Sequence, residues 1–157
     1  MKSRVLVAGI GNVFLGDDGF GVAVAKRLER ELLPEGTRVV DFGIRGVHLA
    51  FDLLSPPDLL VLVDATSRRG TPGTLYVVDP ETDETAVEPA SPDAHSMDPR
   101  AVFMAVRQMG GTLPRTRIVG CEPADLSEGM SLSDPVQQAI EPAVSIIRRL
   151  IESEEVP

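Results

Sequence analysis

The chain of 157 residues has very little cysteine and no long hydrophobic run. Its one cysteine, Cys121, excludes an internal disulfide and a cysteine-rich zinc site. No apolar run approaches the roughly 18 residues of a membrane-spanning helix. The apolar run near the N-terminus is too short for the core of a signal peptide. We therefore expect a cytoplasmic protein without a membrane segment.

Basic residues are also scarce, with 15 Lys and Arg against 24 Asp and Glu and a net charge of -9. Nucleic acids and anionic membranes attract positive charge, so this balance argues against both as partners. Much of the negative charge lies in residues 79–93 and 152–155, where it can simply be solvated. The hydrophobic content of 43% suffices for a well-buried core, and no repeat or linker is visible. We expect residues 1–157 to form a single domain that acts as a monomer.

Several well-known motifs are missing from the glycine-rich turn that follows the apolar segment 4–8. A dinucleotide fingerprint would need a glycine where Phe14 stands, and no Gly-Lys-Ser/Thr of a phosphate-binding loop follows. The whole chain also lacks H-E-x-x-H, G-x-S-x-G and a cysteine–histidine protease signature. The turn instead holds two carboxylates, Asp17 and Asp18, among small residues. Carboxylates repel phosphate and attract cations, so the turn is predicted to bind a metal ion.

Apolar runs alternate with helical patterns along the chain. Strands are predicted over residues 4–8, 37–42, 58–63, 74–78 and 117–121, and helices over 19–33, 47–54, 99–109 and 135–151. The short turn between the third and fourth strands favours an antiparallel arrangement of these two neighbours. The order predicts an α/β fold, a three-layer sandwich whose twisted, mostly parallel five-stranded sheet has helices on both faces. Ligands of such sheets bind beyond the C-terminal ends of the strands.

The first predicted helix has an apolar face and an acidic start. Asp17 or Asp18 is a suitable N-cap, and a proline at residue 34 would end the helix. The side chains on its apolar face are Val22, Ala25, Leu28 and Leu32.

The candidates for catalytic or metal-binding roles are Asp18, Asp64 and His95. Asp17 could cap the first helix as well as Asp18, which would leave Asp18 without a structural task. Asp64 closes a run of five apolar residues, where an aspartate is often just the start of a turn. His95 follows the acidic segment, where a surface histidine is the more common case. Together, two carboxylates and an imidazole on separate loops would form a three-point site with open positions for a divalent metal. Such a donor set suits nickel, zinc, iron or manganese better than magnesium, and we expect Asp18 and Asp64 to face a solvent-filled cleft.

Other polar residues have simpler interpretations. The turn at residues 43–46 is predicted to need a positive φ and to form a wall for the substrate. Arg45 is expected to pair with Asp41 or with an acidic group of the substrate. Cys121 is predicted to be a small buried hydrophobic residue, and Glu122 to mark a strand exit with little chemical content.

The segment Gly-Ile-Gly-Asn-x-x-x-x-Asp-Asp-Gly-x-Gly at residues 9–21 resembles the N-terminal signature of the nickel-hydrogenase maturation endopeptidases. The resemblance continues in order through residues 43–49, 60–65, 95–96, 119–123 and 132–136. Members of that family trim the C-terminal tail of a hydrogenase large subunit after nickel has been inserted. Many relatives carry a small polar residue where this chain has Ile44 or Arg45.

The resemblance implies an endopeptidase whose partner is a hydrogenase large-subunit precursor. The family's metal-contact positions fall on Asp18, Asp64 and His95, which are therefore the expected catalytic and metal-binding residues. The nickel would be supplied by the substrate, and no tightly bound cofactor of the protein's own is expected. Hydrolysis could use polarisation of the carbonyl by the metal, a metal-activated water, or one carboxylate as general base.

Two other functions stay open at this point. One is a non-catalytic maturation factor that senses nickel or binds the precursor through the same three residues. The other is a flavodoxin-like nucleotide binder, against which Phe14 and the paired aspartates argue.

Overall fold

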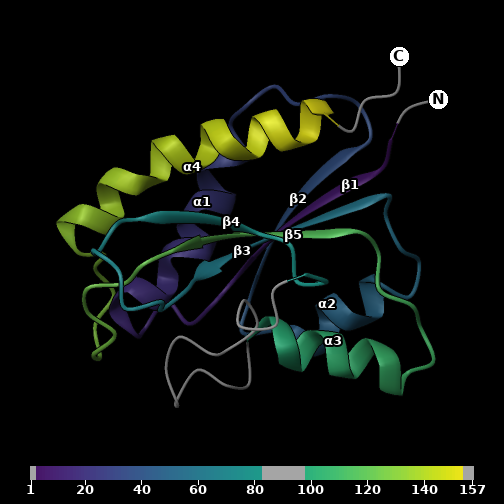
Figure 1. Cartoon of the computed structure of the whole chain (residues 1–157), viewed down its shortest axis with the longest axis horizontal. Helices are drawn as coiled ribbons and strands as arrows, with labels where there is room; N and C mark the ends of the chain where they lie inside the picture. Colours follow the sequence, from purple (N-terminus) through teal and green to yellow (C-terminus); the bar gives the residue numbers. More distant parts are fainter. Residues whose placement is uncertain (1–2, 83–97, 154–157) are drawn as a thin grey trace.

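A single five-stranded sheet organises the computed structural model, which describes residues 3–82 and 98–153 (Figure 1). The strands are β1 (Val5–Ile10), β2 (Thr37–Gly43), β3 (Leu59–Ala65), β4 (Leu75–Val78) and β5 (Thr116–Cys121). They lie in the order β2-β1-β3-β5-β4. The first four of these are parallel, and only β4 runs antiparallel, against β5. The predicted α/β class with a mostly parallel sheet is confirmed.

The position of β4 differs from the prediction. β4 is antiparallel, but its hydrogen-bonded neighbour is β5, which lies between β3 and β4. β3 is buried at all seven positions, so its backbone N–H and C=O groups need partner strands on both sides. β1 and β5 are these partners. β4 is short and only partly buried, as suits a strand at the sheet edge.

Helices cover both faces of the sheet (Figure 1). α1 (Phe20–Leu28) and α4 (Asp134–Ser153) lie on one face, and α2 (Gly46–Asp52) and α3 (Pro99–Gln108) on the other. Alternate residues of a strand point to opposite faces. Val5 and Val7 therefore join the core cluster that includes buried residues of α1 and α4, whereas Leu6 and Ala8 join the cluster of α2 and α3. Among the described residues, no helix is long and apolar enough to cross a membrane.

The first helix is shorter than predicted. It begins as a 3₁₀ helix, η1 (Gly16–Gly19), and α1 ends at Leu28. After that point Arg30 and Glu31 donate their N–H groups to carbonyls three residues earlier, which ends the helix in tight turns. Leu32 consequently lies outside the helix and is 96% exposed, so its predicted place on the apolar face is wrong.

Two glycines let α1 approach the sheet closely. A Cβ atom on Gly21 would lie 2.1 Å from the carbonyl oxygen of Val63 and 2.5 Å from that of Ile10. A Cβ atom on Gly9 would lie 2.3 Å from the carbonyl oxygen of Gly21. The start of α1 is thus held against the C-terminal ends of β1 and β3, and the preceding η1 lies beside the end of β3.

Candidate active site

The C-terminal edge of the sheet brings Asp18 and Asp64 together. Asp18 lies in η1, after β1, and Asp64 is the second-last residue of β3. Gly11 lies between them: a Cβ atom there would be 2.0 Å from the carbonyl oxygen of Asp18 and 3.6 Å from Oδ1 of Asp64. The two aspartates therefore meet at the edge that the sequence indicated. His95, the third predicted residue of the site, lies outside the described residues.

Both carboxyl groups are nearly buried, so the expectation that they face a solvent-filled cleft is wrong. Asp18 is 2% exposed and Asp64 is 6% exposed, because the turn after β1 packs directly against the end of β3. Oδ2 of Asp18 accepts the N–H of Asn12 at 2.8 Å, and Oδ1 of Asp64 accepts the N–H of Ala65 at 2.9 Å. Each carboxylate thus accepts one hydrogen bond from the backbone, which replaces a hydrogen bond to water.

Burial and mutual repulsion shift the ionisation of this pair. Burial raises the pKa of Asp18, and the N–H of Asn12 partly offsets that effect. Burial also raises the pKa of Asp64 well above its ordinary value, and the charges of Asp18 and Asp98 raise it further. Two carboxylates that repel each other away from water form a site that a cation would stabilise.

The described residues supply two carboxylate donors at this edge. Within residues 3–82 and 98–153 there is no group of three or more His, Cys, Asp or Glu side chains that could hold a metal. The nearby Asp98 caps α3, where its Oδ1 accepts the N–H of Ala101 at 2.9 Å. Asp18 and Asp64 therefore offer two oxygen donors and no thiolate, a set that suits a hard or borderline metal ion.

Asp17 has a different task from its neighbour. Its Oδ2 accepts the N–H groups of Ala124 and Asp125 at 2.8 and 2.9 Å, and the Oγ–H of Ser133 at 2.8 Å. Its Oδ1 accepts the N–H of Ser133 at 2.7 Å. Neither aspartate caps α1, since the N-cap is Gly19 without a side-chain hydrogen bond, so that prediction is wrong. Asp17 instead ties the loop between β5 and α4 to the turn that carries Asp18.

The turn after β2 borders the same edge. Gly43 has a φ of +54°, as predicted for this turn, and its carbonyl accepts the N–H of Gly11 at 3.0 Å. Arg45 does not pair with the carboxylate of Asp41. Its guanidinium donates to the backbone carbonyl of Asp41 and, at 3.1 Å, to that of Phe42. Arg45 thereby stabilises the turn itself.

Glu122 is structurally important, although the sequence predicted only a strand exit there. It is 3% exposed, and its Oε1 accepts hydrogen bonds from the N–H of Arg68, the N–H of Gly70 and the hydroxyl of Tyr76, at 2.8, 2.9 and 2.7 Å. Burial raises the pKa of Glu122, but these hydrogen bonds outweigh it and the pKa is lowered. An ionised Glu122 therefore fixes the turn that follows Asp64 at the end of β3.

Cys121 is buried, as predicted. Burial, together with the charges of Asp17 and Glu122, raises the pKa of its thiol to about 12. The thiol is therefore neutral near pH 7 and unsuited to act as a nucleophile.

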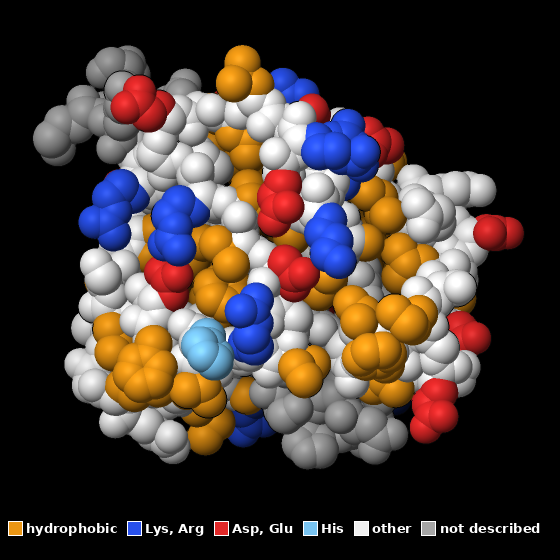
Figure 2. Space-filling model, turned by 180° about the vertical axis from the view of Figure 1, so that it is seen from behind, with side chains coloured by type: hydrophobic (Ala, Val, Ile, Leu, Met, Phe, Trp, Pro, Cys, Tyr) orange, Lys and Arg blue, Asp and Glu red, His pale blue; other side chains and the backbone are white. Residues whose placement is uncertain are grey.

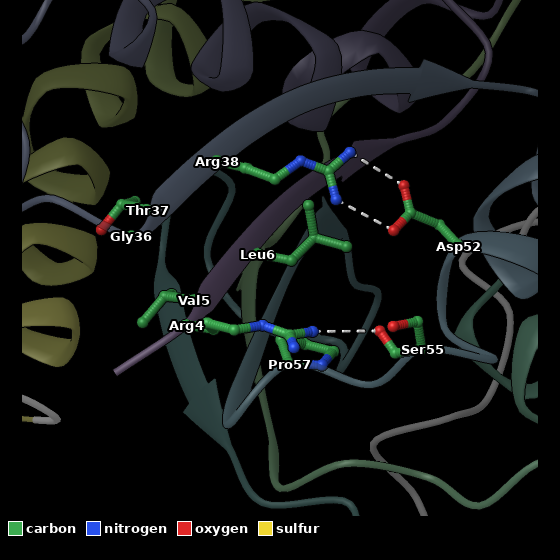
Figure 3. Close-up of a pocket in the computed structure, with 9 residues that line it drawn as sticks. All are labelled: Arg4, Val5, Leu6, Gly36, Thr37, Arg38, Asp52, Ser55 and Pro57. Carbon is green, nitrogen blue, oxygen red and sulfur yellow. Dashed lines mark hydrogen bonds and ion pairs between the residues drawn. The ribbon is translucent and has the colours of Figure 1, made fainter. Parts of the chain in front are cut away.

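A cavity of about 390 Å³ lies at the opposite, N-terminal edge of the sheet (Figure 3). Arg38 and Arg4 both line it. Arg38 forms a two-point ion pair with Asp52 at 3.0 Å for each contact, and Arg4 donates to the carbonyls of Ser55 and Pro56 at 3.4 and 3.0 Å. These contacts connect β1 and β2 to the end of α2, and the cavity is separate from the aspartate pair.

Known proteins resemble this chain over most of its length. The model of a family described as hydrogenase maturation protease matches residues 22–150. Hydrogenase 2 maturation protease of Escherichia coli is 31% identical over 143 residues, which are 90% of this chain and 86% of that protein. Hydrogenase expression/formation protein HupM of Azotobacter chroococcum is 34% identical over 146 residues, or 91% of this chain and 69% of that protein.

Solved structures agree in fold. The hydrogenase maturating endopeptidase HybD from E. coli superposes with a TM-score of 0.81 at 29% identity, covering 96% of this chain and 93% of that one. A [NiFe] hydrogenase maturation protease, HycI from Thermococcus kodakarensis, gives a TM-score of 0.73 at 25% identity, with coverage of 96% and 94%.

Proposed function

Because this chain belongs to the hydrogenase maturation protease family and is an endopeptidase, we propose that it removes the C-terminal extension of a nickel-hydrogenase large-subunit precursor after nickel insertion. The observation that carries this proposal is the pair of buried carboxylates, Asp18 and Asp64, at the C-terminal edge of the sheet. This is where parallel α/β sheets bind their ligands.

In this proposal the nickel is part of the substrate. Asp18 and Asp64 supply two oxygen ligands, and His95 supplies a nitrogen ligand. Burial raises the pKa of Asp64 and the charge of Asp18 raises it further, so two ionised carboxylates are disfavoured here without a cation. A precursor that carries nickel relieves this repulsion and a nickel-free precursor does not, so the same pair distinguishes the two forms.

The aspartate pair is compatible with more than one route to hydrolysis. Substrate nickel can polarise the scissile carbonyl or lower the pKa of a bound water. Alternatively, a carboxylate can take the proton of the attacking water, and a raised pKa makes a carboxylate a stronger base. Burial raises the pKa of both Asp18 and Asp64, so either carboxylate fits this role.

The other functions considered from sequence have less support. A non-catalytic nickel-sensing or precursor-binding factor would use the same residues, but the relatives are named as proteases and endopeptidases. A nucleotide binder would place phosphate beside Asp18 and Asp64, where their negative charges repel it. We also propose that the protein is a cytoplasmic monomer without a resident cofactor.

The test is cleavage of one large-subunit precursor prepared in two forms, nickel-loaded and nickel-free. Incubation with the purified protein, followed by intact mass spectrometry, should show loss of the C-terminal extension only from the nickel-loaded form. Equal cleavage of both forms would refute recognition of nickel. No cleavage of either form would refute the proposed function.

A further inference from the structure

Exposed apolar side chains lie on the loops around the buried aspartate pair. Phe14, in the turn after β1, is 61% exposed, and Met130, in the loop between β5 and α4, is 70% exposed. The N–H of Gly129 donates to the carbonyl of Phe14 at 2.9 Å, and the N–H of Gly16 donates to the carbonyl of Gly129 at 2.8 Å. Phe14 and Met130 therefore project from adjoining loops although they are far apart in the sequence.

A third apolar side chain extends this arrangement. Ile44 follows Gly43, which is hydrogen-bonded to Gly11 beside Asp18 and Asp64, and it is 63% exposed. We call Phe14, Ile44 and Met130 the apolar rim. Single exposed apolar residues need no explanation, but several on joined loops at a ligand-binding edge indicate a contact surface. Figure 2 shows exposed hydrophobic side chains gathered in groups on one face of the molecule.

The loop that carries Met130 is acidic. Asp125, Glu128 and Asp134 are all exposed, and no Lys or Arg occurs between Glu122 and Arg148. Ser127 donates its Oγ–H and N–H to Oδ1 of Asp125 at 2.6 and 2.9 Å, which holds the pKa of Asp125 below its ordinary value. At Met130 the apolar rim thus adjoins acidic side chains, whereas at Ile44 it adjoins Arg45.

The same loop is held in place before any partner binds. Asp17 accepts hydrogen bonds from Ala124, Asp125 and Ser133, which bracket Met130 in the sequence. A surface ordered in advance loses less conformational entropy on binding than a loose one. The loop is therefore suited to a defined contact.

We propose that the apolar rim and the acidic residues beside it are the docking surface for the precursor, and that they select a segment with apolar and basic side chains near the scissile bond. This inference rests on the proposed function. The occupant is a polypeptide because the protein is an endopeptidase, and the part of it that contacts the Met130 loop is basic because Asp125, Glu128 and Asp134 are negatively charged. A second copy of this chain is disfavoured there, since each copy carries a net charge of -9.

The test compares rim variants with matched controls in steady-state cleavage of nickel-loaded precursor. Phe14→Ser and Met130→Ser remove apolar contact, and Glu128→Lys reverses one charge. Leu32→Ser and Glu29→Lys make the same kinds of change at exposed positions beyond the end of α1, away from the aspartate pair. Each rim variant should raise KM about tenfold or more, with the main effect on KM rather than kcat, whereas the controls keep the wild-type KM. Added salt should reduce the effect of Glu128→Lys but not that of Met130→Ser.

The possible outcomes separate the docking surface from the proposed function. If the wild type cleaves the precursor and the rim variants match the Leu32→Ser control, the docking surface is overturned while the function stands. A fall in kcat at unchanged KM also overturns it, because the rim would then act in the chemical step. Loss of a dimer in sedimentation of Phe14→Ser would assign the rim to self-association instead. If the wild type cleaves no precursor, both the proposed function and the precursor as occupant of the apolar rim are refuted. Should Phe14→Ser not fold, Met130→Ser and Glu128→Lys decide the matter.

Discussion

Replacing Asp17 by Asn should destabilise the fold much more than the same change at its neighbour. The Asp17 carboxylate accepts three hydrogen bonds on Oδ2 and one on Oδ1. If the single oxygen of Asn takes the place of Oδ2, the amide NH₂ faces the N–H of Ser133, and two donors meet. Losing a hydrogen bond to a charged group costs about 1.5–3 kcal/mol, and the buried donor left without an acceptor adds to this. We expect Asp17→Asn to lower the free energy of unfolding by about 2–4 kcal/mol and Tm by roughly 5–15 °C.

Asp18→Asn should leave the fold intact and remove activity. The Asp18 side chain accepts one N–H, that of Asn12, and the oxygen of Asn can accept it equally well. Burial raises the pKa of Asp18, so removing its charge also removes a cost of folding at neutral pH. The free energy of unfolding should stay within about 1 kcal/mol of the wild type or rise. Cleavage of nickel-loaded precursor should fall steeply, because an amide is a poor nickel ligand and cannot act as a base.

Two measurements on the wild type, Asp17→Asn and Asp18→Asn check the contrast between the two variants. One is urea unfolding followed by circular dichroism, and the other is precursor cleavage followed by mass spectrometry. Equal stability of Asp17→Asn and the wild type would show that the four hydrogen bonds do not hold the loops together. Unfolding of Asp18→Asn would make Asp18 a structural residue. Normal cleavage by a folded Asp18→Asn would show that the proposed site is wrong.

Three further predictions concern the pair, the packing of α1 and the metal. The folded pKa of Asp64 is raised above 3.8, so its contribution to stability is fully present below that pH and is lost as pH rises through the folded pKa. Asp64→Asn should therefore be more stable than the wild type at neutral pH, and urea unfolding at several pH values should show the difference vanish in acid. Gly21→Ala should lower the free energy of unfolding by about 3 kcal/mol, because the added Cβ meets the carbonyl of Val63. Gly110→Ala meets no atom within 4 Å and should lower it by only about 1–2 kcal/mol, because of the positive φ at that position. Thermal melts of the two variants and the wild type check this difference. Elemental analysis of the purified protein should find little bound metal, and one tightly bound zinc per chain would indicate a conventional metalloprotease instead.

The strands could be predicted from sequence because each central strand contains a short apolar run. The neighbour of β4 could not be predicted, because the strand order depends on which strand needs a partner strand on each side. β3 needs two partners, and nothing within residues 59–65 says that the second partner comes from residues 116–121. The end of α1 was also placed too late, because Leu32 continues the apolar spacing although the chain has already turned toward β2.

The edge that holds Asp18 and Asp64 was predictable for the same reason as the strands. Asp64 closes one apolar run and Asp18 lies in the turn that follows another, and parallel strands end on the same side. Their burial was not predictable, because it arises where two turns meet across Gly11. The tasks of Asp17 and Glu122 were missed because their hydrogen-bond partners lie 107–116 and 46–54 residues away.

The hydrogen bonds of Asp17 join segments of the chain that are synthesised at different times. Ser133 follows Asp17 by 116 residues, so during synthesis the turn with Asp18 exists long before the loop that fixes it. Chains emerge from the ribosome N-terminal part first, and contacts of long sequence separation form late. A nascent chain that has made β1 and η1 but not the start of α4 lacks the bonds that hold Asp18 in place. The turn that carries Asp18 is therefore tied to the loop between β5 and α4 only after synthesis has reached Ser133.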